Sequence, residues 1–182
     1  NIGINIGSSR GATGLWEAFF QQHTEGKIPP LTSPTTTLGN ISSWVAYHLG
    51  NQGLTMDHSV TCSTALHAIL NGVVWLESGR CERFLAGGSE APLTDFTLAQ
   101  MRALRIYAPK EASDYPCRAL DLESASNTMV LGEGSACFAL EKNPEQALAW
   151  IEGIGYSNEK IQTATSISGQ GLEQAMRMAL RE

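Results

Sequence analysis

Cys62 is the residue of this 182-residue chain whose type and position best suit it to chemistry. It lies in residues 58–69 (HSVTCSTALHAI), where a short β-prone segment runs into an apolar helical pattern. Backbone N–H groups without intrahelical partners point out of a helix N-terminus, and the positive end of the macrodipole stabilises a thiolate there. The same amides can donate to an oxyanion. The position therefore predicts a nucleophile for acyl transfer.

A buried filler role is the alternative for every cysteine, because free cysteine is among the residue types most often buried. We assign this role to Cys81, Cys117 and Cys137. The four cysteines form neither a CxxC pair nor a Cys/His spacing typical of zinc. The sequence therefore predicts no metal site, and it favours a reducing, cytoplasmic compartment.

The composition excludes several classes of partner. With 18 acidic against 12 basic residues the formal net charge is −6, which argues against general affinity for nucleic acid or an anionic membrane. No run approaches the roughly 18 apolar residues that a membrane-spanning helix needs. The first residues already alternate like a strand in progress, so we expect the chain to begin inside a larger protein.

A glycine-rich turn at residues 7–14 (GSSRGATG) follows that opening strand. Such a turn can cradle phosphate, but this one has neither GxGxxG nor a GKS or GKT ending. Close backbone packing accounts for its glycines. The sequence predicts no nucleotide cofactor.

The periodicity of apolar residues and the positions of Gly and Pro predict alternating strands and helices. Strands are expected at residues 1–7, 83–90 and 149–156, a hairpin at 130–141, and helices near 15–20, 38–49, 62–78, 94–104 and 172–180. Residues 105–127 should be largely loop. The helix after Cys62 should bury a stripe formed by Leu66, Ile69, Leu70, Val73 and Leu76. The alternation predicts an α/β fold: a mixed, mostly parallel sheet with helices on both faces.

In order and spacing, these segments resemble the N-terminal half of a β-ketoacyl-acyl carrier protein synthase, a condensing enzyme of the thiolase fold. Residues 60–69 resemble the family's nucleophile segment, and residues 86–91 (AGGSEA) resemble its glycine-rich strand end. Further likenesses are MRAL at 101–104, RALD at 118–121, LGEGS at 131–135 and AMRMAL at 175–180. The resemblance covers nearly the whole of residues 1–182.

The resemblance implies a two-stage reaction. Cys62 takes an acyl group from a carrier as a thioester, and a malonyl group on acyl carrier protein then loses carbon dioxide and attacks that thioester. It implies that Thr97 and Met101 line the acyl pocket, that the protein is a homodimer, and that no cofactor is needed. Two histidines, a lysine and a second oxyanion-hole amide would belong to a C-terminal half beyond Glu182, so this chain alone should be inactive.

The sequence departs from the family pattern at three places. Residues 122–129 replace an Arg-Asp-Gly-Phe run, an aromatic-proline feature before Asp121 is absent, and Arg10 stands where the family often has an apolar pocket residue. The first departure keeps open an alternative, a non-catalytic synthase-like partner with a role in chain length or assembly. Retention of Cys62 argues against that alternative.

A cysteine hydrolase is a third hypothesis, and it requires a base beside the sulfur. His67 follows Cys62 by five positions, about 140° round an ideal helix, and should not face it. Glu133, between two glycines, is expected to form hydrogen bonds in a turn. Arg102, Arg105 and Lys110 could form a cationic patch for an acidic carrier protein, although a solvated face is the default interpretation.

Overall fold

The computed structural model describes residues 1–109, 115–159 and 168–181. These residues form two units, Asn1–Lys142 and Asn143–Glu182, which we describe separately. The strands, all in the first unit, are β1 (Ile2–Gly7), β2 (Thr55–Met56), β3 (Arg83–Glu90) and β4 (Gly134–Glu141). The helices are α1 (Thr13–Thr24), α2 (Thr32–Thr36), α3 (Ile41–Leu49), α4 (Thr64–Glu77), α5 (Asp95–Ala103) and, in the second unit, α6 (Gln170–Ala179). Short 3₁₀ turns occupy Leu38–Asn40 and Thr61–Ser63.

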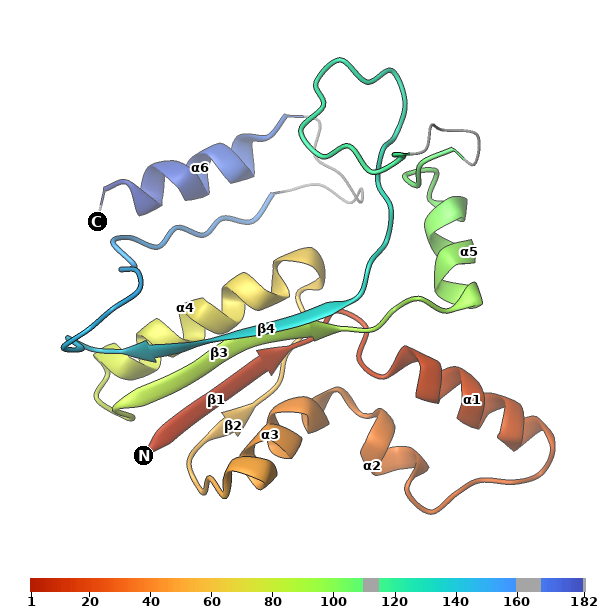
Figure 1. Ribbon diagram of the computed structural model, residues 1–182, viewed down its shortest axis with the longest axis horizontal. Coiled ribbons are helices and arrows are strands. Elements are labelled where there is room, and N and C mark those ends of the chain that lie inside the picture. The colour runs from red at the N-terminus through yellow and green to blue at the C-terminus, as the bar shows by residue number, and fades with distance from the viewer. Residues whose placement is uncertain (110–114, 160–167, 182) are drawn as a thin grey trace. The chain divides into compact units, whose positions relative to one another are not determined.

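The strands form a mixed, mostly parallel sheet in the order β2-β1-β3-β4 (Figure 1). β1 runs parallel to β2 and to β3, and β4 is antiparallel to β3. Because β1 and β3 are parallel, both end at the same edge of the sheet, where Gly7 pairs with Gly88. The sheet confirms the α/β class predicted from the sequence.

Helices cover both faces of this sheet. One apolar cluster joins Ile4 of β1 to Ala46 of α3, and another joins Phe84 of β3 to Ala68 of α4. Phe84 is the register partner of Gly3, and successive residues of a strand point to opposite faces, so Phe84 and Ile4 lie on different faces. α3 and α4 therefore lie on opposite sides of the sheet, as predicted.

The face that α4 presents to the sheet consists mostly of small residues. Its buried residues recur every fourth position and are Thr64, Ala68, Gly72 and Leu76. A Cβ atom at Gly72 would lie 2.8 Å from Cδ1 of Phe84, so only glycine allows the helix to approach this closely. The predicted buried stripe is therefore partly wrong: Leu76 is buried, but Leu66 is 70% exposed. The predicted end of the helix is confirmed, because Gly79 has the left-handed φ of 69° that follows many helices.

Two predicted extended segments pair differently from the prediction. The hairpin expected at 130–141 is wrong, because β4 pairs along its whole length with β3. Residues 149–156 form no strand. A Cβ atom at Gly153 would overlap the Ala179 carbonyl, and one at Gly155 would overlap that of Ala175. This segment packs its glycines against α6 instead of joining a sheet.

The other element predictions hold with shifted ends. The helix expected at 15–20 extends over α1, and the one expected at 38–49 becomes a 3₁₀ turn followed by α3, which Gly50 ends with φ of 59°. β1, β3, α5 and α6 lie where expected, and α2 was not predicted. The strand expected before Cys62 is limited to β2, and residues 57–60 are irregular.

The cysteine predictions are right for one filler and wrong for two. Cys81 is buried, whereas Cys117 and Cys137 are exposed. Cys117 lies in the loop region before β4, and Cys137 lies on β4, whose outer edge has no strand partner within the described sheet.

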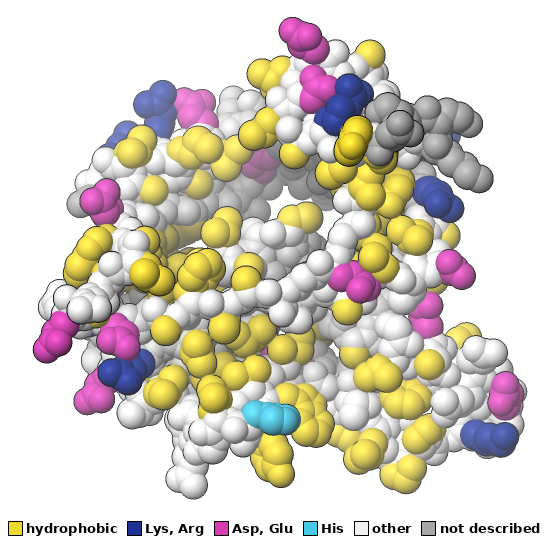
Figure 2. Space-filling view, viewed as in Figure 1, with side chains coloured by type: hydrophobic (Ala, Val, Ile, Leu, Met, Phe, Trp, Pro, Cys, Tyr) yellow, Lys and Arg dark blue, Asp and Glu magenta, His cyan; other side chains and the backbone are white. Residues whose placement is uncertain are grey.

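Apolar side chains spread widely over the face shown in Figure 2. Among the described residues, no helix combines the length and apolarity needed to cross a membrane.

Candidate active site

Cys62 lies in the middle of the 3₁₀ turn Thr61–Ser63, directly before α4, and its side chain is exposed. It lines a cleft of about 530 Å³ that belongs wholly to the first unit. The residues around Cys62 in this cleft are Gly7, Ser9, Thr61, Thr64, Ala65, Ile69, Gly87, Gly88, Glu90, Gly134, Ser135, Ala136 and Phe138. The structure thus places the predicted nucleophile in a hollow, in the 3₁₀ turn that precedes α4 rather than in the first turn of the helix itself.

The cleft forms where strand ends meet. β1 and β3 end side by side, and β4 begins opposite the end of β3, with Gly134 paired to Glu90. Ligands in α/β proteins bind at the carboxyl ends of parallel strands, because the loops that follow can diverge there. Three glycines at these strand ends, Gly7, Gly87 and Gly88, allow close packing, because a Cβ atom at each would overlap a neighbouring residue.

The turn that carries Cys62 has an unusual backbone. Thr61 has φ of 53°, in the left-handed region that β-branched residues rarely adopt. The Thr64 hydroxyl spans the turn: it donates to the Thr61 carbonyl at 2.6 Å and accepts the Val60 N–H at 3.0 Å. Ser63 Oγ also donates to the Val60 carbonyl at 3.1 Å. Such strain persists only where surrounding contacts over-determine it.

A polar network lies beneath this turn, and sequence reasoning missed it. Asn5 is fully buried; its Nδ2 donates to the Met56 carbonyl at 2.9 Å and lies 3.1 Å from Nδ1 of His58. Asn71 Nδ2 donates to Asn5 Oδ1 at 2.8 Å. His58 Nε2 lies 3.0 Å from the Thr64 carbonyl. The signal was present in the sequence, because an asparagine inside an apolar strand must find partners when buried.

Two glutamates serve as hydrogen-bond acceptors near the cleft. Glu90 Oε1 accepts the Ser9 N–H, and within the described part of the chain its Oε2 is buried without a partner. Because Glu90 lines the cleft, this oxygen can accept a donor from a bound molecule. Glu133 accepts the Leu93 N–H at 3.0 Å, so its predicted hydrogen-bonding role is confirmed, although it lies directly before β4 and not in a turn.

The residues expected to line an acyl pocket lie on α5. Thr97 is fully buried, and its N–H donates to Thr94 Oγ1 at 3.2 Å as part of the helix cap. Met101 is partly buried. Neither residue is among those that line the Cys62 cleft, so their pocket role stays a prediction. Arg10 donates to Gln100 Oε1 of the same helix at 2.8 Å.

None of the described histidines lines the cleft. His67 lies with Nδ1 3.0 Å from the Ser63 carbonyl, consistent with the structural role expected for it. The described residues also contain no group of three or more His, Cys, Asp or Glu side chains that could hold a metal ion. Arg102 and Arg105 are exposed, and Lys110 lies outside the described residues.

Asp57 lies next to the polar network. Burial raises the pKa of its carboxyl group above the ordinary value of 3.8. Hydrogen bonds from Ser42, whose N–H donates to Oδ1 at 3.1 Å, act in the opposite direction without cancelling this shift. Asp57 thus connects α3 to the loop after β2 through its hydrogen bond with Ser42, and partial burial of its charged carboxylate is the unfavourable part of this contact.

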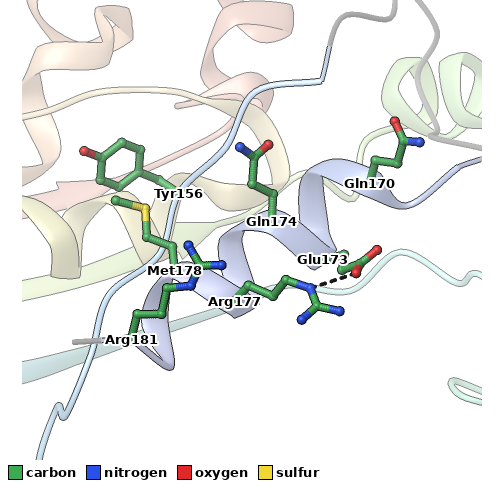
Figure 3. Close-up of a pocket in the computed structure, with 7 residues that line it drawn as sticks. All are labelled: Tyr156, Gln170, Glu173, Gln174, Arg177, Met178 and Arg181. Atoms are coloured by element: carbon green, nitrogen blue, oxygen red, sulfur yellow. Dashed lines mark hydrogen bonds and ion pairs between the residues drawn. The ribbon is translucent and has the colours of Figure 1, made fainter.

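A second pocket, of about 660 Å³, lies within the second unit beside α6 (Figure 3). An ion pair of 2.8 Å between Arg177 and Glu173 crosses its wall, and Met178 and Tyr156 lie toward one side. Its lining includes no cysteine, serine or histidine. This pocket therefore offers no nucleophile comparable to Cys62.

Comparison with known proteins identifies the family. The profile of the β-ketoacyl synthase N-terminal domain matches residues 1–146. The chain therefore belongs to the β-ketoacyl synthase family.

Relatives and solved structures agree with this assignment. The chain is 33% identical to nodulation protein E of Rhizobium leguminosarum bv. trifolii, with 84% of this chain and 37% of the relative covered. It is 27% identical to 3-oxoacyl-(acyl-carrier-protein) synthase 2 of Vibrio harveyi, with 100% and 46% covered. The chain also superposes with TM-score 0.83 and 22% identity on a chain of a solved complex, covering 99% of this chain and 48% of that one. The complex is described as a type II polyketide synthase acyl carrier protein in complex with its ketosynthase bound to the hexaketide. The chain thus spans less than half the length of each of these proteins.

Proposed function

We propose that this chain is the nucleophile-bearing N-terminal half of a β-ketoacyl-acyl carrier protein synthase. The observation that carries the proposal is the exposed Cys62 in a strained turn at the mouth of a strand-end cleft. Family membership supports it, because family members named as synthases elongate acyl chains held on acyl carrier protein.

The proposed reaction uses Cys62 twice. Its sulfur attacks the thioester carbonyl of an acyl carrier protein; the new C–S bond forms, the old one breaks, and the carrier thiol leaves with a proton. A malonyl carrier protein then loses carbon dioxide, and the resulting enolate carbon attacks the acyl-Cys62 carbonyl. A C–C bond forms, the C–Sγ bond breaks, and the Cys62 thiolate is regenerated.

Each stage places negative charge on an oxygen, first in the tetrahedral intermediate and then in the enolate. We assign the Cys62 N–H as one donor to the tetrahedral oxyanion. The second donor and the decarboxylation residues, two histidines and a lysine, belong to the C-terminal half of the full-length protein. This division explains why the described cleft contains a nucleophile without a neighbouring imidazole.

The partners follow from the reaction. The protein takes both substrates from acyl carrier protein and acts as a homodimer in the cytoplasm. Arg102 and Arg105 are exposed beside the C-terminal end of α5 and are suited to an acidic carrier. Thr97 and Met101 of the same helix, together with Arg10, are the residues we expect to limit acyl chain length.

The test is condensation by the full-length protein. Supplied with acyl carrier protein and malonyl carrier protein, it should release carbon dioxide and form a β-ketoacyl carrier. Cys62→Ala should abolish the β-ketoacyl product, whereas Cys137→Ala, at another exposed thiol, should leave it unchanged. Absence of a β-ketoacyl product from the unmodified protein would favour the non-catalytic partner role.

A further inference from the structure

We infer that His58 is a positioning residue for Cys62: its imidazole, oriented by Asn5, holds the turn that carries the nucleophile. This inference rests on the proposed function of Cys62 and adds a residue that has no contact with the substrate. The bond concerned runs from His58 Nε2 to the carbonyl oxygen of Thr64, 3.0 Å away.

The hydrogen-bond donors and acceptors around Asn5 fix the form of the imidazole. The Met56 backbone carbonyl can only accept, so the end of the Asn5 side chain beside it is the NH₂ group, and Oδ1 at the other end accepts from Asn71. That group has two hydrogens, one for the Met56 carbonyl and one for Nδ1 of His58. Nδ1 must then be an acceptor, and the ring proton lies on Nε2. The network thus leaves His58 as a neutral donor aimed at Thr64.

Thr64 connects this donor to the nucleophile. Thr64 is nearly fully buried, and its hydroxyl forms bonds to Thr61 and Val60 on the two sides of the turn. The Thr64 side chain therefore fixes the segment that contains Cys62, while His58 fixes the Thr64 main chain. Thr61 keeps its left-handed φ of 53° only while these bonds persist.

The packing around the imidazole leaves it little freedom. A Cβ atom at Gly7 would overlap Cγ2 of Thr64 and lie 3.4 Å from Cε1 of His58, so the end of β1 rests directly on both side chains. The ring is also linked to β1 through Asn5 and, by way of Asn5, to α4 through Asn71. His58 thus connects β1 of the sheet to the turn that carries Cys62, because it contacts both Asn5 and Thr64.

Two matched variants distinguish the contact made by Nε2 of His58 from the contact made by Nδ1. In His58→Gln the amide nitrogen can take the place of Nε2 and donate to Thr64. In His58→Asn the shorter amide can meet Asn5 but cannot reach Thr64. With the full-length protein and acyl carrier protein, acylation of Cys62 should fall about tenfold or more in His58→Asn and stay near the unmodified rate in His58→Gln. Thermal unfolding would show that each variant is folded.

The outcomes distinguish the inference from the proposed function. If the unmodified protein takes no acyl group at Cys62, the proposed function fails. If the unmodified protein is acylated, two results would show that the positioning role is wrong. One is a folded His58→Asn variant that is acylated as fast as the unmodified protein. The other is a folded His58→Gln variant that is acylated as slowly as His58→Asn. Should His58→Asn not fold, the tautomer decides: ¹H–¹⁵N spectra of histidine-labelled protein should show a proton on Nε2 of His58 and none on Nδ1. The reverse tautomer would overturn the inference.

Discussion

At the scale of single residues, the site depends on polar groups that the sheet and α4 bury together. Asn5 on β1 meets His58 and Asn71, residues 53 and 66 positions later in the chain. A buried amide is stable only when its donors and acceptors are used, and the contacts of Asn5 use three of them. The turn that carries Cys62 is therefore connected to distant parts of the chain by long-range hydrogen bonds.

Asp57 gives the residue scale a pH-dependent prediction. Burial raises the pKa of Asp57, so the folded state holds the Asp57 proton more tightly than the unfolded state does. The protonated carboxyl group therefore stabilises the folded state at low pH. This stabilisation is lost as pH rises from 3.8 through the folded-state pKa. In Asp57→Asn this loss is absent. The free energy of unfolding of the variant, minus that of the unmodified protein, should therefore increase over this range.

Urea denaturation at a series of pH values from 4 to 7, about the window in which such a group titrates, measures this difference. Glu145→Gln, at an exposed carboxylate, is the control and should give a flat difference. A difference for Asp57→Asn that decreases as pH rises would mean that hydrogen bonds from Ser42 outweigh burial.

At the scale of elements, the cleft depends on close contact between β3 and β4. Gly87 lies opposite Cys137, and a Cβ atom there would overlap the Ala136 carbonyl and lie 2.8 Å from Cα of Cys137. These neighbours are backbone atoms, which cannot rotate away as a side chain can. The glycine at this position thus allows β3 and β4 to lie in close contact beside the cleft.

Gly87→Ala should accordingly destabilise the protein by about 1–3 kcal/mol, the usual cost of overpacking. Thermal or urea unfolding measures the change. Gly132→Ala is the matched control, because a Cβ atom at Gly132 meets nothing within 4 Å and its effect should stay within about 0.5 kcal/mol. Equal stability of the two variants would contradict this account of the β3–β4 contact.

The elements also show how far the sequence allowed prediction. The alternation of apolar and polar residues and the positions of Gly and Pro located β1, β3, α5 and α6. The position of Cys62 before a helix predicted it as the nucleophile. The pairing of β4 with β3, and the packing of residues 149–156 against α6 rather than in a sheet, depend on contacts between distant segments. Local patterns do not encode such contacts. For the same reason His58 could not be connected to Asn5 before their positions in space were known.

At the scale of the whole molecule, many large apolar side chains of the described residues are exposed. Large apolar side chains that are at least 70% exposed are Leu66, Tyr47, Tyr115, Leu120, Leu122, Leu148 and Leu180. They occur in both units. Exposed apolar patches of large extent usually mark surfaces that another part of a protein covers.

This surface gives a prediction for the 182-residue polypeptide by itself. It should bind the dye ANS and form associated species, whereas the full-length protein should do neither beyond a defined dimer. Dye fluorescence together with light scattering after gel filtration would measure both properties. A monodisperse monomer of the isolated chain that binds no dye would show that these side chains need no cover.

The central claim is that the Cys62 sulfur holds the acyl group, and peptide mass mapping tests it most directly. Full-length protein incubated with acyl carrier protein is digested, and the cysteine peptides are compared. The account predicts an acyl mass increase on the Cys62 peptide alone, with the exposed Cys117 and Cys137 unmodified as internal controls. An adduct spread equally over these thiols, or none on Cys62, would contradict the account.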